Sequence, residues 1–130
     1  GFDVQITRLD DAGIFDFASQ GNHNIVNMGW TSADPGVLAF VYNSANIEGG
    51  SAFSRFRSAE LDQTLTDAAA ALDADERAAL YGQAQMIIMQ NALALPLHTY
   101  ARLMLMAANV QGWQFDGEGY PWLSQVWLAQ

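Results

Sequence analysis

The sequence predicts an α/β fold in which a pair of helices packs against short strands. Two amphipathic patterns with helix-capping residues lie next to each other at 58–72 and 73–91, and an apolar run interrupted by a proline follows at 93–100. Because proline cannot donate to a sheet ladder, that run is expected at an edge or at the start of a strand. The chain has 130 residues, of which 51% are hydrophobic, and this suits one ordered domain.

The N-terminal part of the chain alternates between strand and helix patterns. Residues 2–7 alternate apolar and polar side chains, and a period of two is typical of a half-buried strand. An aspartate at position 10 or 11 can cap a short helix over 12–19, which Gly21 ends. A second strand, with large apolar side chains, is expected over 24–30.

A turn and a loop separate these elements from the helical pair. The Asp-Pro-Gly sequence at 34–36 is typical of a turn. The apolar run over 37–42 is interpreted as a short helix, and the stretch over 43–54, rich in Asn, Gly and Ser, as a loop.

The helical pair carries the clearest pattern. Ser58 is expected to cap the first helix, and Asp73 with Glu76 fits a capping box at the start of the second. Asp62 and Asp67 are expected to face solvent. One face of each helix has apolar or small residues at spacings of three and four: Leu61, Leu65, Ala68, Ala69 and Leu72, then Leu80, Ala84, Ile87, Ile88 and Asn91.

The C-terminal part of the chain predicts further short strands. Residues 102–107 and 124–128 are expected to be strands, and 110–115 is a short aromatic stretch between them. Glycines and a proline over 117–121 indicate a loop.

Charge and composition exclude several partners and chemistries. Five basic residues, all arginine, stand against 14 acidic ones, which gives a net charge of −9. This balance argues against nucleic acid and against an anionic membrane surface, because both require a basic patch. The absence of cysteine removes disulfides, thiolate nucleophiles and cysteine-based zinc sites. The longest apolar run is far shorter than the ~20 residues that a membrane-spanning helix needs, and no signal-peptide pattern is visible.

Catalytic and cofactor motifs are missing from the sequence. His23 and His98 are the only histidines, and neither has a second ligand at metal-binding spacing. The carboxylates at 73–76 are explained as helix caps. The sequence therefore predicts a protein that is not an enzyme and has no cofactor and no metal site. An acid–base hydrolase that uses Asp34 with a second carboxylate is the remaining enzymatic alternative.

Trp30 and Asp34 stand on either side of a break in the apolar pattern. The expected strand ends at Trp30, and small polar residues lead from there to the turn. A turn needs neither a tryptophan nor a carboxylate in these places, although simple packing and turn formation are the plainer interpretation. A ligand cleft uses both residue types, and clefts form where strands end.

The order of the motifs resembles a known family. The chain contains G-x-D-V-x-I, N-x-x-x-x-G-W, D-P and N-S-x-N, followed by R-F-R-S-A-E-L-D-x-x-L, D-A-D-E-R-A-A-L-Y-G-Q-A-Q-x-I-I, L-P-L-H and V-Q-G-W. This order resembles the C-terminal part of an extracytoplasmic solute-binding protein of the peptide/nickel/oligopeptide ABC-transporter class, family 5. The resemblance covers nearly the whole chain and is most specific over 55–85.

The resemblance implies a fragment of a two-lobed periplasmic-binding-protein-like fold, with the helical pair on a mixed sheet. Residues 1–28 would form the end of the second lobe and the strand that crosses between lobes, and 29–130 the C-terminal section of the first lobe. Residues just after the crossing strand line the ligand cleft in this family. The positions that would border a ligand are Gly29, Trp30, Thr31, Ser32 and, as the acidic residue, Asp34.

The family resemblance also implies partners and a location. The protein would capture a peptide or other small solute outside the cytoplasm, in the periplasm or an equivalent compartment, and deliver it to the membrane permease of an ABC importer. Many peptide binders carry the acid three places after the tryptophan, where this chain has Ala33. Nickel, sugar and opine-like ligands therefore stay as open as peptide.

Two further expectations follow from the same comparison. With only part of each lobe, the chain should expose strand edges and apolar faces that drive self-association. The alternative to a binding protein is a structural or interaction domain with no ligand site of its own. In that case Trp30 should be fully buried and away from any cleft.

Overall fold

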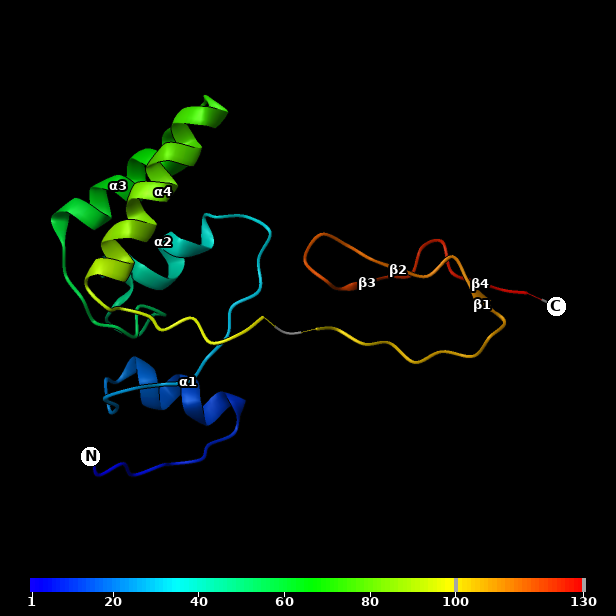
Figure 1. The fold of residues 1–130 in the computed structure, drawn as a ribbon, viewed down its shortest axis with the longest axis horizontal. Coiled ribbons are helices and arrows are strands. Elements are labelled where there is room, and N and C mark those ends of the chain that lie inside the picture. Colours follow the sequence, from blue (N-terminus) through cyan, green and yellow to red (C-terminus); the bar gives the residue numbers. More distant parts are fainter. Residues whose placement is uncertain (100, 130) are drawn as a thin grey trace. The chain divides into compact units, whose positions relative to one another are not determined.

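The computed structural model describes residues 1–99 and 101–129 (Figure 1). Contacts between residues divide the chain into two compact units. The first contains Gly1–Gly29 and Pro35–Leu95, and the second contains Trp30–Asp34 and Pro96–Gln130. The units are therefore described one at a time.

The first helix, α1, spans Asp11–Ser19 and confirms the helix expected at 12–19. Asp10 is its N-cap, because its Oδ1 accepts a hydrogen bond of 2.8 Å from the amide of Gly13. The chain leaves the helix through Gly21, whose φ of +76° lies in the left-handed region that glycine adopts without steric cost.

The turn and the short helix after it form as the sequence predicts. The amide of Leu38 donates to the Pro35 carbonyl at 3.0 Å, and α2 then spans Val37–Tyr42. The following loop contains one 3₁₀ turn, η1, over Ser44–Asn46.

The helical pair is formed by α3, over Ala59–Ala70, and α4, over Ala74–Gln90. Both predicted caps are confirmed. Ser58 Oγ accepts from the Leu61 amide at 3.2 Å. Asp73 Oδ1 accepts from the amides of Asp75 and Glu76 at 3.0 and 2.9 Å. These side chains satisfy amides in the first turn that have no partner within the helix.

The core of the first unit lies between α3 and α4, which run next to each other (Figure 1). Leu38 and Tyr42 of α2 pack against this core. Leu72 was expected on the inner face but is 98% exposed, because α3 ends at Ala70 and the residue falls in the short connection. Ala69 and Asn91 are exposed as well. The core residues are Leu61, Leu65, Ala68, Tyr81, Ala84, Ile87 and Ile88.

The expectation that Asp62 faces solvent is wrong. Its two carboxylate oxygens accept hydrogen bonds from Ser44, one from the backbone amide at 2.8 Å and one from the hydroxyl at 2.5 Å. Asn46 adds bonds from its Nδ2 to the carbonyls of Ala39 and Phe40, at 3.1 and 3.2 Å. Asp62 thus fastens the loop to α3, while Asn46 fastens the same loop to the end of α2.

Four predicted strands do not form in the part of the chain that the structure describes. Residues 2–7, 24–30, 93–99 and 102–107 have no regular secondary structure, and Tyr100, the last residue of the third prediction, lies outside the described residues. Phe2 is 98% exposed and Leu105 100% exposed. A strand needs a neighbouring strand to pair with and a covered apolar face, and the alternation of side chains alone supplies neither. Among the described residues of the first unit no strand forms, so the helical pair has no sheet partner within that unit.

The second unit contains two short antiparallel pairs. β1, Val110–Gln111, pairs with β4, Trp127–Leu128, and β2, Gln114–Phe115, pairs with β3, Pro121–Trp122. The predicted strand over 124–128 is therefore shorter than expected, and Pro121 belongs to a strand rather than to a loop.

One glycine and one aspartate determine the shape of the two strand pairs. Gly112 splits the aromatic stretch, with a φ of +72°, and a Cβ there would lie 2.1 Å from the Gln125 carbonyl oxygen. Asp116 closes the β2–β3 turn, because its Oδ1 accepts from the amides of Glu118 and Tyr120 at 2.9 and 2.8 Å. A mixed α and β composition is thus confirmed, with helices and small antiparallel sheets.

The chain should lose stability in alkali through Tyr42. Burial raises the pKa of its phenol above the ordinary value of 10.0, because the charged phenolate is poorly solvated against the helical core. An acid whose pKa is raised by folding stabilises the fold below the unfolded pKa and ceases to do so as pH rises through the folded value. The free energy of unfolding should therefore fall above about pH 10.

Denaturant unfolding between about pH 8 and about pH 11, followed by helical circular dichroism, tests this expectation. Tyr42→Phe should remove most of the fall, whereas Tyr120→Phe, at an exposed site in the second unit, should leave it in place. A Tyr42→Phe protein that loses stability with pH as the parent does would contradict the assignment.

The exposed apolar segments predict self-association of the chain. Phe2, Val4 and Ile6 lie on one extended segment, and Leu103 and Leu105 on another, all largely exposed. A second copy can cover these side chains by exchanging or adding a strand over residues 1–10.

Multi-angle light scattering should give a mass above the 14.2 kDa of one chain, rising with concentration. Val4→Asp combined with Leu105→Asp should shift the mass towards the monomer, and Asn27→Asp serves as a matched exposed control. A monomer at every usable concentration would show that these segments do not associate.

None of the helices within the described ranges is long and apolar enough to cross a membrane.

Candidate functional site

The candidate binding segment comprises the five predicted residues Gly29, Trp30, Thr31, Ser32 and Asp34. All five are exposed, and the segment has an extended and bent backbone without regular secondary structure. The amide of Asp34 donates to Ser32 Oγ at 3.0 Å, which sets the bend just before the turn at Pro35. The five consecutive residues Trp30–Asp34 thus present an indole, two hydroxyls and a carboxylate.

Trp30 retains 36% of its surface exposed, even though it is a large aromatic residue. This exposure differs from what the structural-domain alternative requires, namely a fully buried Trp30. An indole that is part-covered and part-open can offer an apolar wall to a ligand.

The predicted strand before the segment is absent, so the segment is not held at a strand end. Residues 24–30 lack regular structure, and Ile25 is exposed. Contacts assign Gly29 to the first unit and Trp30–Asp34 to the second. The lobe division at residues 28 and 29 stays a prediction.

The two histidines lie in different surroundings. His98 falls in the predicted strand over 93–100, but it is exposed and lies outside any strand. His23 is partly covered, and its Nδ1 is buried without a hydrogen-bond partner among the described residues. No group of three or more His, Cys, Asp or Glu side chains within 1–99 and 101–129 is arranged to hold a metal ion.

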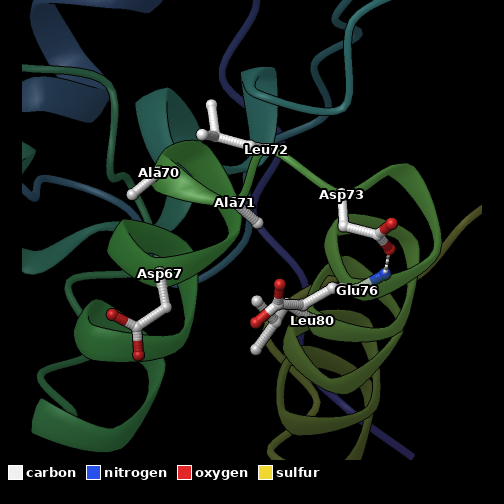
Figure 2. Close-up of a pocket in the computed structure, with 7 residues that line it drawn as sticks. All are labelled: Asp67, Ala70, Ala71, Leu72, Asp73, Glu76 and Leu80. Atoms are coloured by element: carbon white, nitrogen blue, oxygen red, sulfur yellow. Dashed lines mark hydrogen bonds between the residues drawn. The ribbon is translucent and has the colours of Figure 1, made fainter.

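An open hollow of about 610 Å³ lies where α3 meets α4, and two of its three carboxylates have structural partners (Figure 2). Asp67 accepts a bond of 2.8 Å from Gln63 Nε2, and Asp73 caps α4. Figure 2 shows the Asp73 carboxylate turned to the Glu76 amide. Since this arrangement is a helix cap, the hollow does not compete with the candidate binding segment. Its lining residues are Asp67, Ala70, Ala71, Leu72, Asp73, Glu76 and Leu80.

The hydrogen bonds of two polar residues in the first unit were not predicted from the sequence. Asp62 binds Ser44, and Arg55 binds the carbonyl of Ser19 at 3.1 Å. The partners are 18 and 36 residues apart in the chain, so no local spacing could indicate them.

Comparison with known proteins gives two informative relatives. The chain is 34% identical over 129 residues to the probable di/tripeptide-binding protein 5 of Pseudomonas aeruginosa, covering 97% of this chain and 24% of that protein. It is 31% identical over 106 residues to heme-binding protein A of Haemophilus influenzae, covering 79% of this chain and 19% of that protein.

The extent of these matches defines the relationship. The chain spans about a quarter or less of the length of either relative, and the match lies in their C-terminal part. No family model matches the chain, and no solved structure matches it significantly. Both relatives are named as binding proteins. From these matches, together with the motif order, we conclude that the chain belongs to the family 5 solute-binding proteins.

Proposed function

We propose that this chain is part of the substrate-binding component of an ABC importer that captures a peptide or another small solute outside the cytoplasm. The observation that carries the proposal is the relationship to two binding proteins, which extends over 97% and 79% of the chain. The bound solute would pass to the importer's membrane permease, and the protein would act without catalysing a reaction.

The candidate binding segment supplies the groups for such a role. Trp30 would form an apolar wall, and the carboxylate of Asp34 would face a cationic or amine-bearing group of the solute. The backbone and hydroxyl groups of Thr31 and Ser32 would hydrogen-bond to polar parts of the same molecule. The 36% exposure of Trp30 supports this assignment over a purely structural one.

Calorimetry on a full-length protein that contains this region tests the proposal. The titrants are a dipeptide, a tripeptide, heme, nickel ion and a neutral sugar. Saturable binding of one class, weakened by Trp30→Ala, is the expected result. A protein that is folded but binds none of these solutes would support the structural or interaction domain instead.

A further inference from the structure

Asp116 has a sequence neighbour that no other aspartate of the chain has. It is the only aspartate that a glycine follows, and no asparagine of the chain precedes a glycine. In such a pair the amide nitrogen of the glycine can attack the side-chain carboxyl carbon of the aspartate, because the glycine has no Cβ to shield its nitrogen. The sequence thus makes the pair Asp116–Gly117 susceptible to a reaction between a side chain and its own backbone.

The β2–β3 turn holds the two reacting groups next to each other. Asp116 Oδ1 accepts hydrogen bonds from the amides of Glu118 and Tyr120, at 2.9 and 2.8 Å. A bond to the amide two residues ahead folds the side chain back over the intervening peptide, which here belongs to Gly117. Because the reactants are already held close together, part of the entropic barrier to the reaction is removed.

The attacking nitrogen is open to its target. Gly117 is exposed, and its amide donates no hydrogen bond to any residue that the structure describes. A Cβ at Gly117 would have no other atom within 4 Å, so no neighbouring group covers the residue. The amide can therefore turn towards the carboxyl group without first breaking a bond.

Asn43 and Ser44 form a natural comparison within the same chain. The side chain of Asn43 also folds over the next peptide, because its Oδ1 accepts from the amide of Ala45 at 2.9 Å. The Ser44 amide, however, donates to Asp62 Oδ1 at 2.8 Å. The two pairs thus differ in whether the attacking amide is engaged in a hydrogen bond, and the fold should block the reaction at Asn43.

We propose that Asp116 is the site at which the folded chain isomerises its own backbone. The nitrogen of Gly117 forms a bond to Asp116 Cγ and loses its proton, while one oxygen of the protonated carboxyl group leaves as water. The product is a cyclic imide, which water reopens at either of its two carbonyl carbons. Opening at the original backbone carbonyl gives isoaspartate, in which the main chain runs through Cγ. The reaction requires no reagent other than water.

Isoaspartate at position 116 would open the β2–β3 turn. The former side-chain carbonyl becomes part of the main chain, so it no longer holds the amides of Glu118 and Tyr120 in their present places. The main chain also gains one carbon atom, which disturbs the pairing of Phe115 with Pro121. The Arg102 guanidinium lies 4.9 Å from the centre of the Tyr120 ring, and this stack depends on the same turn.

Mass spectrometry of the aged chain tests the proposal. The chain is stored folded in a mildly acidic buffer and then digested with trypsin, which cuts after Arg102. The resulting peptide, 103–130, contains Asp116 as its only aspartate. Isoaspartate should accumulate as a separately eluting peptide of unchanged mass, which electron-transfer fragmentation assigns to position 116. Asn43 should remain an amide in this sample and should react only when the chain is aged in urea.

Gly117→Ala is the matched variant, because the added Cβ meets no other atom and the fold should be retained. The Cβ shields the attacking nitrogen, so the accumulation of isoaspartate at position 116 should fall severalfold. The near-ultraviolet circular dichroism of the aromatic side chains shows whether the variant keeps the parent fold. Where that spectrum changes, the comparison of the folded parent with the parent in urea decides the question.

Isoaspartate that forms in urea but not in the folded chain would show that the turn protects Asp116, and this result overturns the proposal. Equal accumulation in a folded Gly117→Ala chain overturns the route through the glycine nitrogen. Reaction of Asn43 in the folded chain as fast as in urea also contradicts the proposal, because the hydrogen bond of the Ser44 amide would then have no effect.

Discussion

Ile87→Ala should lower the free energy of unfolding by about 2–5 kcal/mol. Ile87 is only 8% exposed and belongs to the core between α3 and α4. Truncation removes buried methyl groups and leaves a cavity that two packed helices cannot fill completely. Urea unfolding followed by helical circular dichroism measures the loss.

Met89→Ala is the matched control for this experiment, because Met89 lies on the same helix and is 51% exposed. Its cost should stay within about 0.5 kcal/mol, as for most surface substitutions. If both variants lose the same free energy of unfolding, or if Ile87→Ala loses almost none, the face of α4 assigned to the core is wrong.

In a full-length protein, Asp34→Asn should weaken binding of an amine-bearing solute by about 2–5 kcal/mol while leaving stability little changed. The amide retains most of the hydrogen-bonding capacity of the carboxylate but lacks its negative charge. The loss of the negative charge weakens binding only if Asp34 pairs with a cationic group of the solute. Calorimetry with a dipeptide gives the affinity, and thermal unfolding gives the stability.

Asp3→Asn controls for the change in net charge, since Asp3 is exposed in the extended N-terminal segment. It should leave the affinity unchanged. If Asp34→Asn also leaves the affinity unchanged, Asp34 only shapes the turn. Many peptide binders carry their acidic residue at the place of Ala33, so the acid that pairs with the solute would then be missing from this chain.

The helices could be predicted from the sequence because their signals are local. Ser58 and Asp73 lie within three residues of the amides that they cap, and the apolar spacing of α3 and α4 defines their shared face. The strand predictions failed for the opposite reason. Residues 2–7 have the right alternation, but a strand also depends on a neighbour that the alternation does not specify.

The candidate site shows the same limit. The turn after Asp34 was predictable from Asp-Pro-Gly, whereas the role of Trp30 in binding a ligand stays a prediction. The bond of Arg55 to Ser19 was not predictable, because it joins residues 36 positions apart.

The pairing of Ser44 with Asp62 has a consequence for which substitutions the two positions tolerate. Asp62 accepts one bond from the Ser44 backbone amide and one from its hydroxyl. Every residue except proline supplies that amide, so alanine or glycine at position 44 forfeits one bond and retains the other. Losing the carboxylate at position 62 forfeits both. Among related sequences, position 44 should therefore vary freely between small residues, while position 62 should be confined to side chains that offer two acceptor sites.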